Sequence, residues 1–201
     1  MVSTQFEKYN IILASKSPRR QQLLAGMNIP FTTLIKDVDE SFDKSMPVGE
    51  VAGYLSLKKA LAFKTEELSN NFLLITADTI VVIDNEVLNK PIDRDDAIAM
   101  LIRLSGHNHK VITGVSLRDA KEIVTFTEES EVHFVSLTTA EIEYYVDEYK
   151  PYDKAGSYGI QEWIGYVAIE SVRGSFFNVM GLPTHRLYRE IVNFVKRNNA
   201  L

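Results

Sequence analysis

Hydroxyl and cationic side chains are concentrated in the segment SKSPRR, residues 15–20, directly after the apolar residues 11–14. Those apolar residues are typical of a short buried strand. Ser17 followed by Pro18 predicts the start of a helix, because serine caps free backbone N–H groups and proline is tolerated at the first helical position. A helix N-terminus favours anions, and guanidinium groups suit phosphate. The pattern therefore predicts a phosphate site lined by Ser15, Ser17, Arg19 and Arg20. A capped surface helix with solvated arginines explains the same residues equally well.

Two acidic places in the sequence would hold a divalent cation beside a bound phosphate. One is Asp78, which interrupts a long apolar run, where an unpaired buried carboxylate is costly. This residue is a metal ligand, a base or half of an ion pair, unless it lies in a turn at a strand end. The other place is the loop DVDES, with Asp37, Asp39 and Glu40, although acidic loops are usually solvated surface.

Lysines recur along the chain at Lys58 and Lys59, at Lys90 in NKP and at Lys154 in DKAG. Each alone carries little information, because lysines are usually exposed. As a set with SKSPRR they would surround a polyphosphate. The chain contains no Walker A motif, and its four histidines show no metal-ligand spacing, so they receive no chemical role.

The elements that must position these side chains alternate between strands and helices, which predicts an α/β fold. Short turns join several strand pairs, so the sheet should be mixed rather than purely parallel. The patterns predict strands at 11–15, 31–35, 72–84, 109–119, 122–137 and 163–172, and helices at 17–26, 47–68, 93–106, 138–149 and 182–197.

Composition limits the protein's class. A chain of 201 residues fits one domain or two closely packed lobes, and the absence of cysteine excludes disulfides, thiolate catalysis and cysteine–zinc sites. No apolar run is long enough to span a membrane, and the N-terminal residues lack a signal-peptide pattern, so we expect a cytoplasmic protein without a membrane partner. The formal net charge of -5 argues against nucleic acid as a partner.

Seven motifs follow one another along nearly the whole chain: LASKSPRRQQLL, VDE, KKA, ADTIVVIDNEVLNKP, LSGHNHKVITGV, DKAGSYGIQ and GSFFNVMGLP. In this order they resemble the Maf family of nucleoside triphosphate pyrophosphatases, within the ITPase-like superfamily. The resemblance implies a single domain over residues 1–201, with a long twisted mixed β-sheet flanked by helices and two lobes around a nucleotide cleft. It also implies hydrolysis of a nucleoside triphosphate between the α and β phosphates with a divalent cation, usually Mg²⁺, and a homodimer.

The resemblance carries roles onto matching positions. Asp78 would activate water and share the metal with Glu40, while Lys59, Lys90 and Arg20 would stabilise developing negative charge. Ser15 and the backbone of the first turn would hold the phosphates. The base would be chosen by Arg19, Thr79 and Gln161, which resemble the dTTP/UTP branch of the family and not the 7-methyl-GTP branch.

Two residues depart from the family pattern. Asn89 and Glu162 stand where glycine is frequent in the family, and Glu162 would narrow the mouth of the cleft or add negative charge there.

Two alternative functions stay open. One alternative is a non-catalytic nucleotide-binding regulator of septum formation and cell division. Hydrolysis is favoured over it, because the charged positions that the chemistry needs are present. Another alternative keeps the reaction but takes modified nucleotides as substrates.

Overall fold

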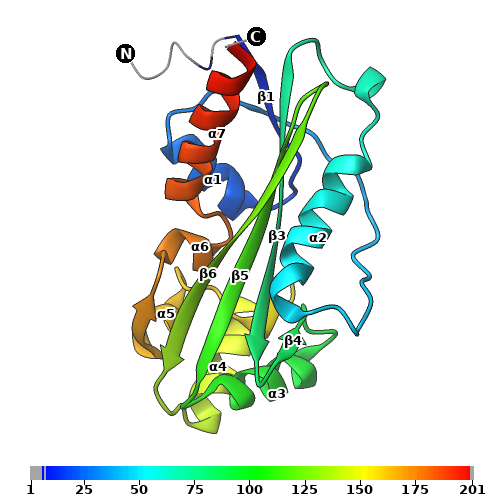
Figure 1. The fold of residues 1–201 in the computed structure, drawn as a ribbon. Coiled ribbons are helices and arrows are strands. Elements are labelled where there is room, and N and C mark those ends of the chain that lie inside the picture. Colours follow the sequence, from blue (N-terminus) through cyan, green and yellow to red (C-terminus); the bar gives the residue numbers. More distant parts are fainter. Residues whose placement is uncertain (1–5, 7, 200–201) are drawn as a thin grey trace. The chain divides into compact units, whose positions relative to one another are not determined.

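The computed structural model describes Phe6 and residues 8–199 (Figure 1). Seven strands of this part of the chain pair in one mixed sheet, in the order β2-β1-β3-β5-β6-β7, with β4 paired to β3. The expected α/β class with a mixed sheet flanked by helices is confirmed. The described residues form two compact units: the first comprises those up to Asp78, 113–128 and 181–199, and the second comprises 79–112 and 129–180.

The first unit is built around parallel strand pairing. Strand β1 (Asn10–Leu13) pairs in parallel with β2 (Thr32–Thr33) and with β3 (Phe72–Ile83). Helix α1 (Pro18–Gly26) connects β1 to β2, and the Ser17 side chain caps it by accepting from the Arg20 backbone N–H. Each strand of the β1–β3 pair contributes buried apolar side chains to the core, where Ile12, Phe63, Phe72 and Leu74 pack together.

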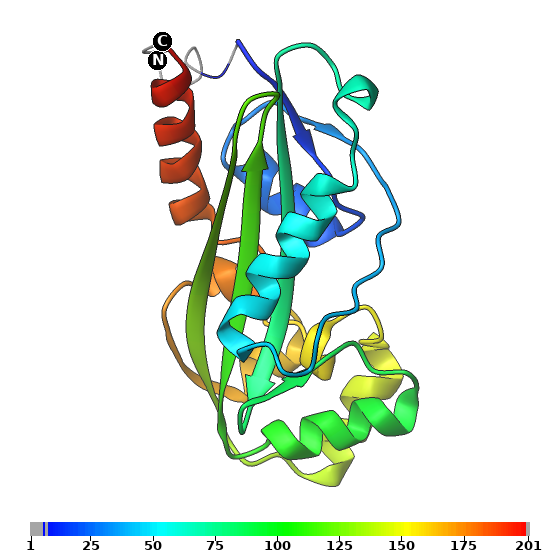
Figure 2. The same ribbon diagram turned by 45° about the vertical axis from the view of Figure 1, so that its right-hand side comes forward.

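Helices α2 (Val48–Leu61) and α7 (Thr184–Asn199) complete the first unit. Helix α2 lies over one face of the strands, and α1 and α7 lie over the other (Figure 2). The approach of α2 to strand β5 (Asn108–Arg118) is so close that a Cβ atom on Gly114 would overlap the backbone of Ala52 and Gly53. This close contact sets the height of α2 above the sheet.

The second unit holds the far end of β3 with β4 (Glu86–Leu88), and the last residues of β6 (Ile123–Phe134) paired with β7 (Ile169–Arg173). Helices α3 (Arg94–Leu104) and α4 (Thr139–Tyr149) pack against each other. Their N-termini are capped by Asp93 for α3 and by the Thr138–Glu141 capping box for α4. The unit also contains η3 (Ala155–Ser157), α5 (Trp163–Val167) and α6 (Phe176–Met180).

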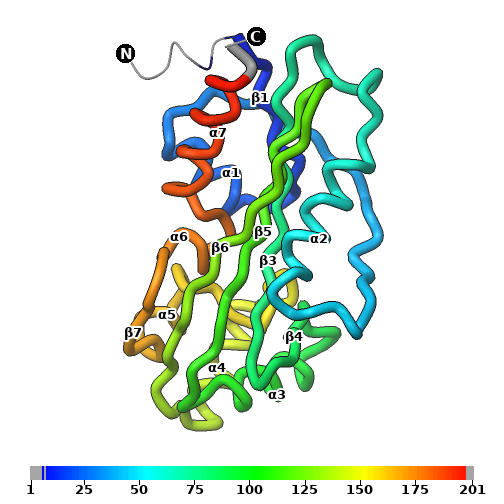
Figure 3. The backbone as a smooth tube through the Cα atoms, in the orientation of Figure 1, coloured from blue at the N-terminus to red at the C-terminus, as the bar shows by residue number. Residues whose placement is uncertain are grey.

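Three predicted elements differ from the structure. The segment 163–172 was expected to be one strand, but it forms helix α5 followed by β7 (Figure 3). The Gly165 N–H donates to the Glu162 carbonyl, and Gly165 packs so tightly on the Ile160 carbonyl that a Cβ atom there would overlap it. This glycine contact favours the helical turn over the strand that the apolar pattern indicates.

The other two differences are shorter elements. Strand β2 keeps only Thr32–Thr33 of the expected 31–35, and α2 ends at Leu61, with a separate 3₁₀ turn η2 (Thr65–Glu67) after it. The single domain over residues 1–201 and the nucleotide cleft stay predictions. Among the described residues, no helix is both long and apolar enough to cross a membrane.

Candidate active site

The ammonium group of Lys59 joins two carboxylates in the first unit. Its Nζ lies 2.5 Å from Asp78 Oδ1 and 2.8 Å from Glu40 Oε1. The side chains of Asp78 and Lys59 are 11% and 16% exposed, whereas that of Glu40 is 45% exposed. Asp78 is thus neither unpaired nor in a strand-end turn: it lies inside strand β3 and is neutralised by an ion pair.

Buried hydroxyl groups fix the position of Lys59 opposite Asp78. Thr76 on β3 donates from Oγ1 to the Ser56 carbonyl on α2 at 2.7 Å, and the Ser56 hydroxyl lies 3.0 Å from that of Ser116 on β5. All three side chains are buried. These hydrogen bonds hold α2 in register with the strands, because slipping the helix would leave buried polar groups unpaired.

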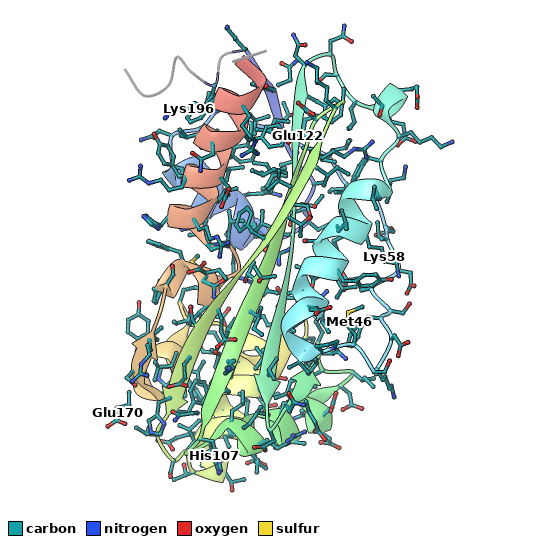
Figure 4. All side chains as sticks on the ribbon, in the orientation of Figure 1. Met46, Lys58, His107, Glu122, Glu170 and Lys196 are labelled. Carbon is teal, nitrogen blue, oxygen red and sulfur yellow. The ribbon has the colours of Figure 1, made fainter. Side chains whose placement is uncertain are left out.

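The loop that carries Glu40 is anchored to α2 by Lys58, which precedes Lys59 in the helix. Lys58 extends from α2 (Figure 4). Its Nζ lies 2.9 Å from Asp39 Oδ2 and 3.0 Å from the Ser41 carbonyl. Hydrogen bonds from the Ser41 hydroxyl and from Lys58 lower the pKa of Asp39 to about 2. Asp37 forms a surface ion pair with Lys16, in which Oδ1 lies 2.5 Å from Lys16 Nζ. Of the three acidic residues in DVDES, only Glu40 therefore reaches Lys59 in the described contacts.

The residues of the predicted anion site lie in the turn before α1 and in its first turn. The Ser15 hydroxyl accepts from the Ser17 backbone N–H at 3.1 Å, so it forms part of the turn itself. Arg20 is held by two backbone carbonyls: Nε donates to Gly181 O at 2.8 Å and Nη1 to Ala77 O at 2.9 Å. Burial lowers the pKa of Arg20, and the nearby Asp78 carboxylate opposes that shift. Arg19 precedes Arg20 in the first turn of α1.

The structure thus brings Arg20, Glu40, Lys59 and Asp78 together in the first unit, with Ser15 and Arg19 in the adjoining turn. The remaining predicted residues belong to the second unit. Thr79 is half-buried in β3, Lys90 is exposed after β4, and Gln161 is half-buried after η3. The Lys90 turn is tied down by the hydrogen bond from Gly156 N–H to Asn89 O, at 3.2 Å.

Sequence reasoning missed a polar cluster around Glu162 in the second unit. The Tyr145 hydroxyl donates to Glu162 Oε2, and Lys154 Nζ lies 3.1 Å from Glu162 Oε1. Burial and the Glu162 carboxylate both raise the pKa of Tyr145. Glu162 was singled out only as a departure from the family pattern. Tyr145 gave no signal, because an aromatic residue on the buried face of a helix is usually core.

Comparison with known proteins assigns the chain. A family model described as Maf-like protein matches residues 10–194. The chain belongs to the Maf family. This Maf-family chain is 51% identical to the dTTP/UTP pyrophosphatase of Parabacteroides distasonis, over 94% of this chain and 97% of that protein. It is 45% identical to the dTTP/UTP pyrophosphatase of Flavobacterium psychrophilum, over 96% and 98%.

Solved structures include a more distant match, the Staphylococcus aureus Ham1 protein. It aligns with a TM-score of 0.45 at 11% identity, over 62% of this chain and 71% of that one. That likeness is too distant to inform the site of this Maf-family member.

Proposed function

We propose that this Maf-family chain hydrolyses dTTP and UTP between the α and β phosphates, giving the nucleoside monophosphate and pyrophosphate. The relatives that carry this activity in their names align over nearly their full length. The observation on this chain that supports the proposal best is the Lys59 ammonium between Asp78 and Glu40, with Arg20 adjacent. An acceptor for a proton and a set of cations for phosphate oxygens are what such a hydrolysis needs.

Asp78 is the proposed general base. A water oxygen forms the new bond to the α phosphorus, its proton passes to an Asp78 carboxylate oxygen, and the bond from the α phosphorus to the bridging oxygen breaks, so that pyrophosphate leaves with that electron pair. General-base assistance of this kind contributes about a hundred- to ten-thousand-fold to the rate. Lys59 holds the Asp78 carboxylate in place from 2.5 Å.

The cationic groups are proposed to stabilise the charge that spreads over the phosphate oxygens. Arg20 is fixed by its two carbonyl contacts, so its orientation is set before a ligand binds. Ser15 and the backbone of the first turn of α1 would hold phosphate oxygens. Lys90 is assigned to the same charge stabilisation, and the choice of base is assigned to Arg19, Thr79 and Gln161.

A divalent cation, most simply Mg²⁺, fits the donors that are present. Oxygens of Glu40 and Asp78 converge on a single nitrogen, so two carboxylates face one cationic position. Among the described residues, no group of three histidine, cysteine, aspartate or glutamate side chains forms a metal cage. Mg²⁺ is commonly bound by one or two carboxylates together with substrate phosphates and water. When bound, it would neutralise charge on the phosphate oxygens.

The proposal extends to location and assembly. We propose a cytoplasmic enzyme that acts as a homodimer, supported by the family resemblance. Light scattering on the purified protein tests the dimer, and a mass equal to one chain would contradict it.

Pyrophosphate release from a panel of nucleotides with Mg²⁺ tests the reaction. The panel comprises dTTP, UTP, CTP, GTP, ITP and 7-methyl-GTP. Release that is fastest from dTTP and UTP is the expected result. Fastest release from a purine nucleotide would keep the chemistry and overturn the substrate assignment. Binding of dTTP without release of pyrophosphate would overturn the hydrolase and favour the regulator of septum formation.

A further inference from the structure

Glu162 is the acceptor for three side chains of the second unit. Its Oε2 accepts from the Tyr145 hydroxyl, which itself accepts from the Gly159 backbone N–H at 3.0 Å. Its Oε1 lies 3.1 Å from Lys154 Nζ and 3.4 Å from Gln161 Nε2. The carboxylate is therefore held from both sides, and its orientation is fixed by groups on α4 and on the segment around η3.

The chain leaves room for this arrangement at Gly159. A Cβ atom at that position would lie 2.8 Å from Gln161 Nε2 and 2.9 Å from Glu162 Cδ. Both distances are below those that real Cβ contacts show. The glycine thus allows the amide of Gln161 and the carboxylate of Glu162 to approach each other over the backbone.

The contact with Glu162 decides which way the Gln161 amide points. An ionised carboxylate can only accept hydrogen bonds, and a glutamine amide has one donor end and one acceptor end. The donor Nε2 must therefore face Glu162, which turns Oε1 away. Among the described residues, the buried Oε1 has no hydrogen-bond partner. A buried acceptor without a partner costs free energy, and such an atom calls for an explanation.

A donor from the bound base would supply the missing partner. Uracil and thymine carry a hydrogen on N3, whereas N3 of cytosine is an acceptor. An acceptor held in one orientation would accept a hydrogen bond from N3–H of uracil or thymine. The same acceptor would repel the lone pair on N3 of cytosine. A glutamine that was free to rotate its amide would accept either base, since it offers an acceptor or a donor as needed.

We propose that Glu162 is a positioning residue, which holds the Gln161 amide with its oxygen toward the base so that the site selects bases with an N3–H. The inference rests on the proposed function, and it assigns to Glu162 a part in choosing uracil and thymine over cytosine. Specificity of this kind arises because a wrong partner leaves a buried polar group unpaired.

Charge compensation alone does not account for the Glu162 contacts. The buried Lys154 already pairs with Asp153 at 2.7 Å, so its charge has a partner on the same segment. The Tyr145 hydroxyl needs a hydrogen-bond acceptor, and Glu162 supplies it. The Gln161 amide does not depend on Glu162 in this way, because an amide that is free to turn can direct its Nε2 to another acceptor. The consequence particular to Glu162 is the fixed direction of that amide.

A double-mutant cycle tests the proposal, with kcat and KM measured for UTP and CTP. Glu162→Gln keeps the shape of the side chain but supplies both a donor and an acceptor, so the Gln161 amide is free to turn. We expect the ratio of kcat/KM for UTP to that for CTP to fall at least about tenfold, mainly through KM. In a Gln161→Met background the same Glu162→Gln change should leave the ratio unaltered, because the group through which Glu162 acts is gone.

The control is Glu170→Gln, the same substitution on a surface glutamate of the same unit that pairs with His133 (Figure 4). The UTP to CTP ratio of this variant should equal that of the wild type. An unchanged ratio in Glu162→Gln would overturn the proposal. The proposal would also be overturned if Glu162→Gln lowered the UTP to CTP ratio equally in the wild-type and the Gln161→Met backgrounds. That result would show that Glu162 acts independently of the Gln161 amide.

Two further measurements keep the test decisive. If Glu162→Gln does not fold, the variant Tyr145→Phe takes its place, because it removes one of the donors that fix Glu162. The ratio of kcat/KM for UTP to that for CTP should then also fall. An unchanged ratio would overturn the inference. If the wild type releases pyrophosphate from no nucleotide, the proposed function fails separately. The affinities for UMP and CMP, measured by calorimetry, then decide: a preference for UMP that Glu162→Gln removes supports the positioning role, and equal affinities overturn it.

Discussion

Lys59 Nζ lies 2.5 Å from Asp78 Oδ1, and the two residues come from a helix and a strand that buried hydroxyl groups hold in register. The pair places a carboxylate in an apolar strand without leaving it unpaired. It also holds Asp78 next to Arg20, whose guanidinium is directed by two backbone carbonyls. The proposed base and its neighbouring cations are thus fixed by the packing of α1, α2 and β3 before any ligand is bound.

Replacing Asp78 with asparagine should remove turnover but leave nucleotide binding largely intact. The amide keeps the size of the side chain but cannot accept a proton from water at neutral pH. We expect kcat for pyrophosphate release to fall by about a hundred- to ten-thousand-fold. The matched control is Asp84→Asn, the same change in the exposed turn that follows β3, where asparagine tolerates the positive φ of 52°. Near-normal activity of Asp78→Asn would show that another group is the base.

Replacing Lys59 with methionine should destabilise the fold as well as the reaction. Removal of one partner of a largely buried ion pair leaves an uncompensated charge, which costs about 3 kcal/mol or more. Adding Asp78→Asn to Lys59→Met should recover part of that loss, since the remaining buried group is then neutral. Urea unfolding of the two single variants and the double variant measures the coupling.

The neighbouring lysine gives the control for this cycle. Lys58 pairs with the exposed Asp39, so Lys58→Met should change the free energy of unfolding much less than Lys59→Met does. Equal losses for Lys58→Met and Lys59→Met would contradict the importance assigned to the Lys59–Asp78 pair.

The sequence was sufficient to predict much of the fold and to single out residues that the structure brings together in the first unit, because those features depend on local chemistry. The cap of α1 at Ser17, the buried β3 run and the odd position of Asp78 are all readable from residue type and spacing. The contact between Lys59 and Asp78 is not readable in that way. It depends on the height of α2 above the sheet, which the pair Gly53 and Gly114 sets through a backbone contact.

The errors have the same origin. The run 163–172 has an apolar pattern that suits a strand, but the contact between Gly165 and the Ile160 carbonyl turns its first part into α5. Glu162 could be recognised as unusual, yet its partners Tyr145 and Lys154 come from separate segments and only tertiary structure brings them to it. Specific packing contacts, and not propensities, decided each of these features.

Replacing Glu40 with alanine should weaken the dependence on Mg²⁺ while leaving the fold intact. Glu40 is 45% exposed and lies in a loop that Lys58 anchors independently, so its loss removes a proposed ligand without opening the core. The Mg²⁺ concentration at half-maximal activity should rise. The control is Glu66→Ala, an exposed glutamate of η2 in the same unit. An unchanged Mg²⁺ titration would remove Glu40 from the metal site.

His109 should make the protein less stable in acid. Its side chain is buried against Phe134 and Tyr158, and Nε2 lies 2.8 Å from the Tyr158 hydroxyl. Desolvation lowers the pKa of His109 from 6.5 to about 4. Between these values the unfolded chain binds a proton that the folded chain does not, so the contribution to stability is complete above pH 6.5 and is lost as the pH falls toward 4.

The loss attributable to His109 is up to about 3 kcal/mol. Denaturant unfolding at pH 7.5, 6.0, 5.0 and 4.0 measures it, with His109→Gln as the variant that cannot titrate but still reaches Tyr158. The difference in unfolding free energy between wild type and His109→Gln should shrink toward acid or change sign. His133, which is partly exposed and pairs with Glu170, gives the control variant His133→Gln. A difference between wild type and His109→Gln that stays constant over this range would show that the folded protein admits the charged imidazole, and that burial of His109 does not drive its acid sensitivity.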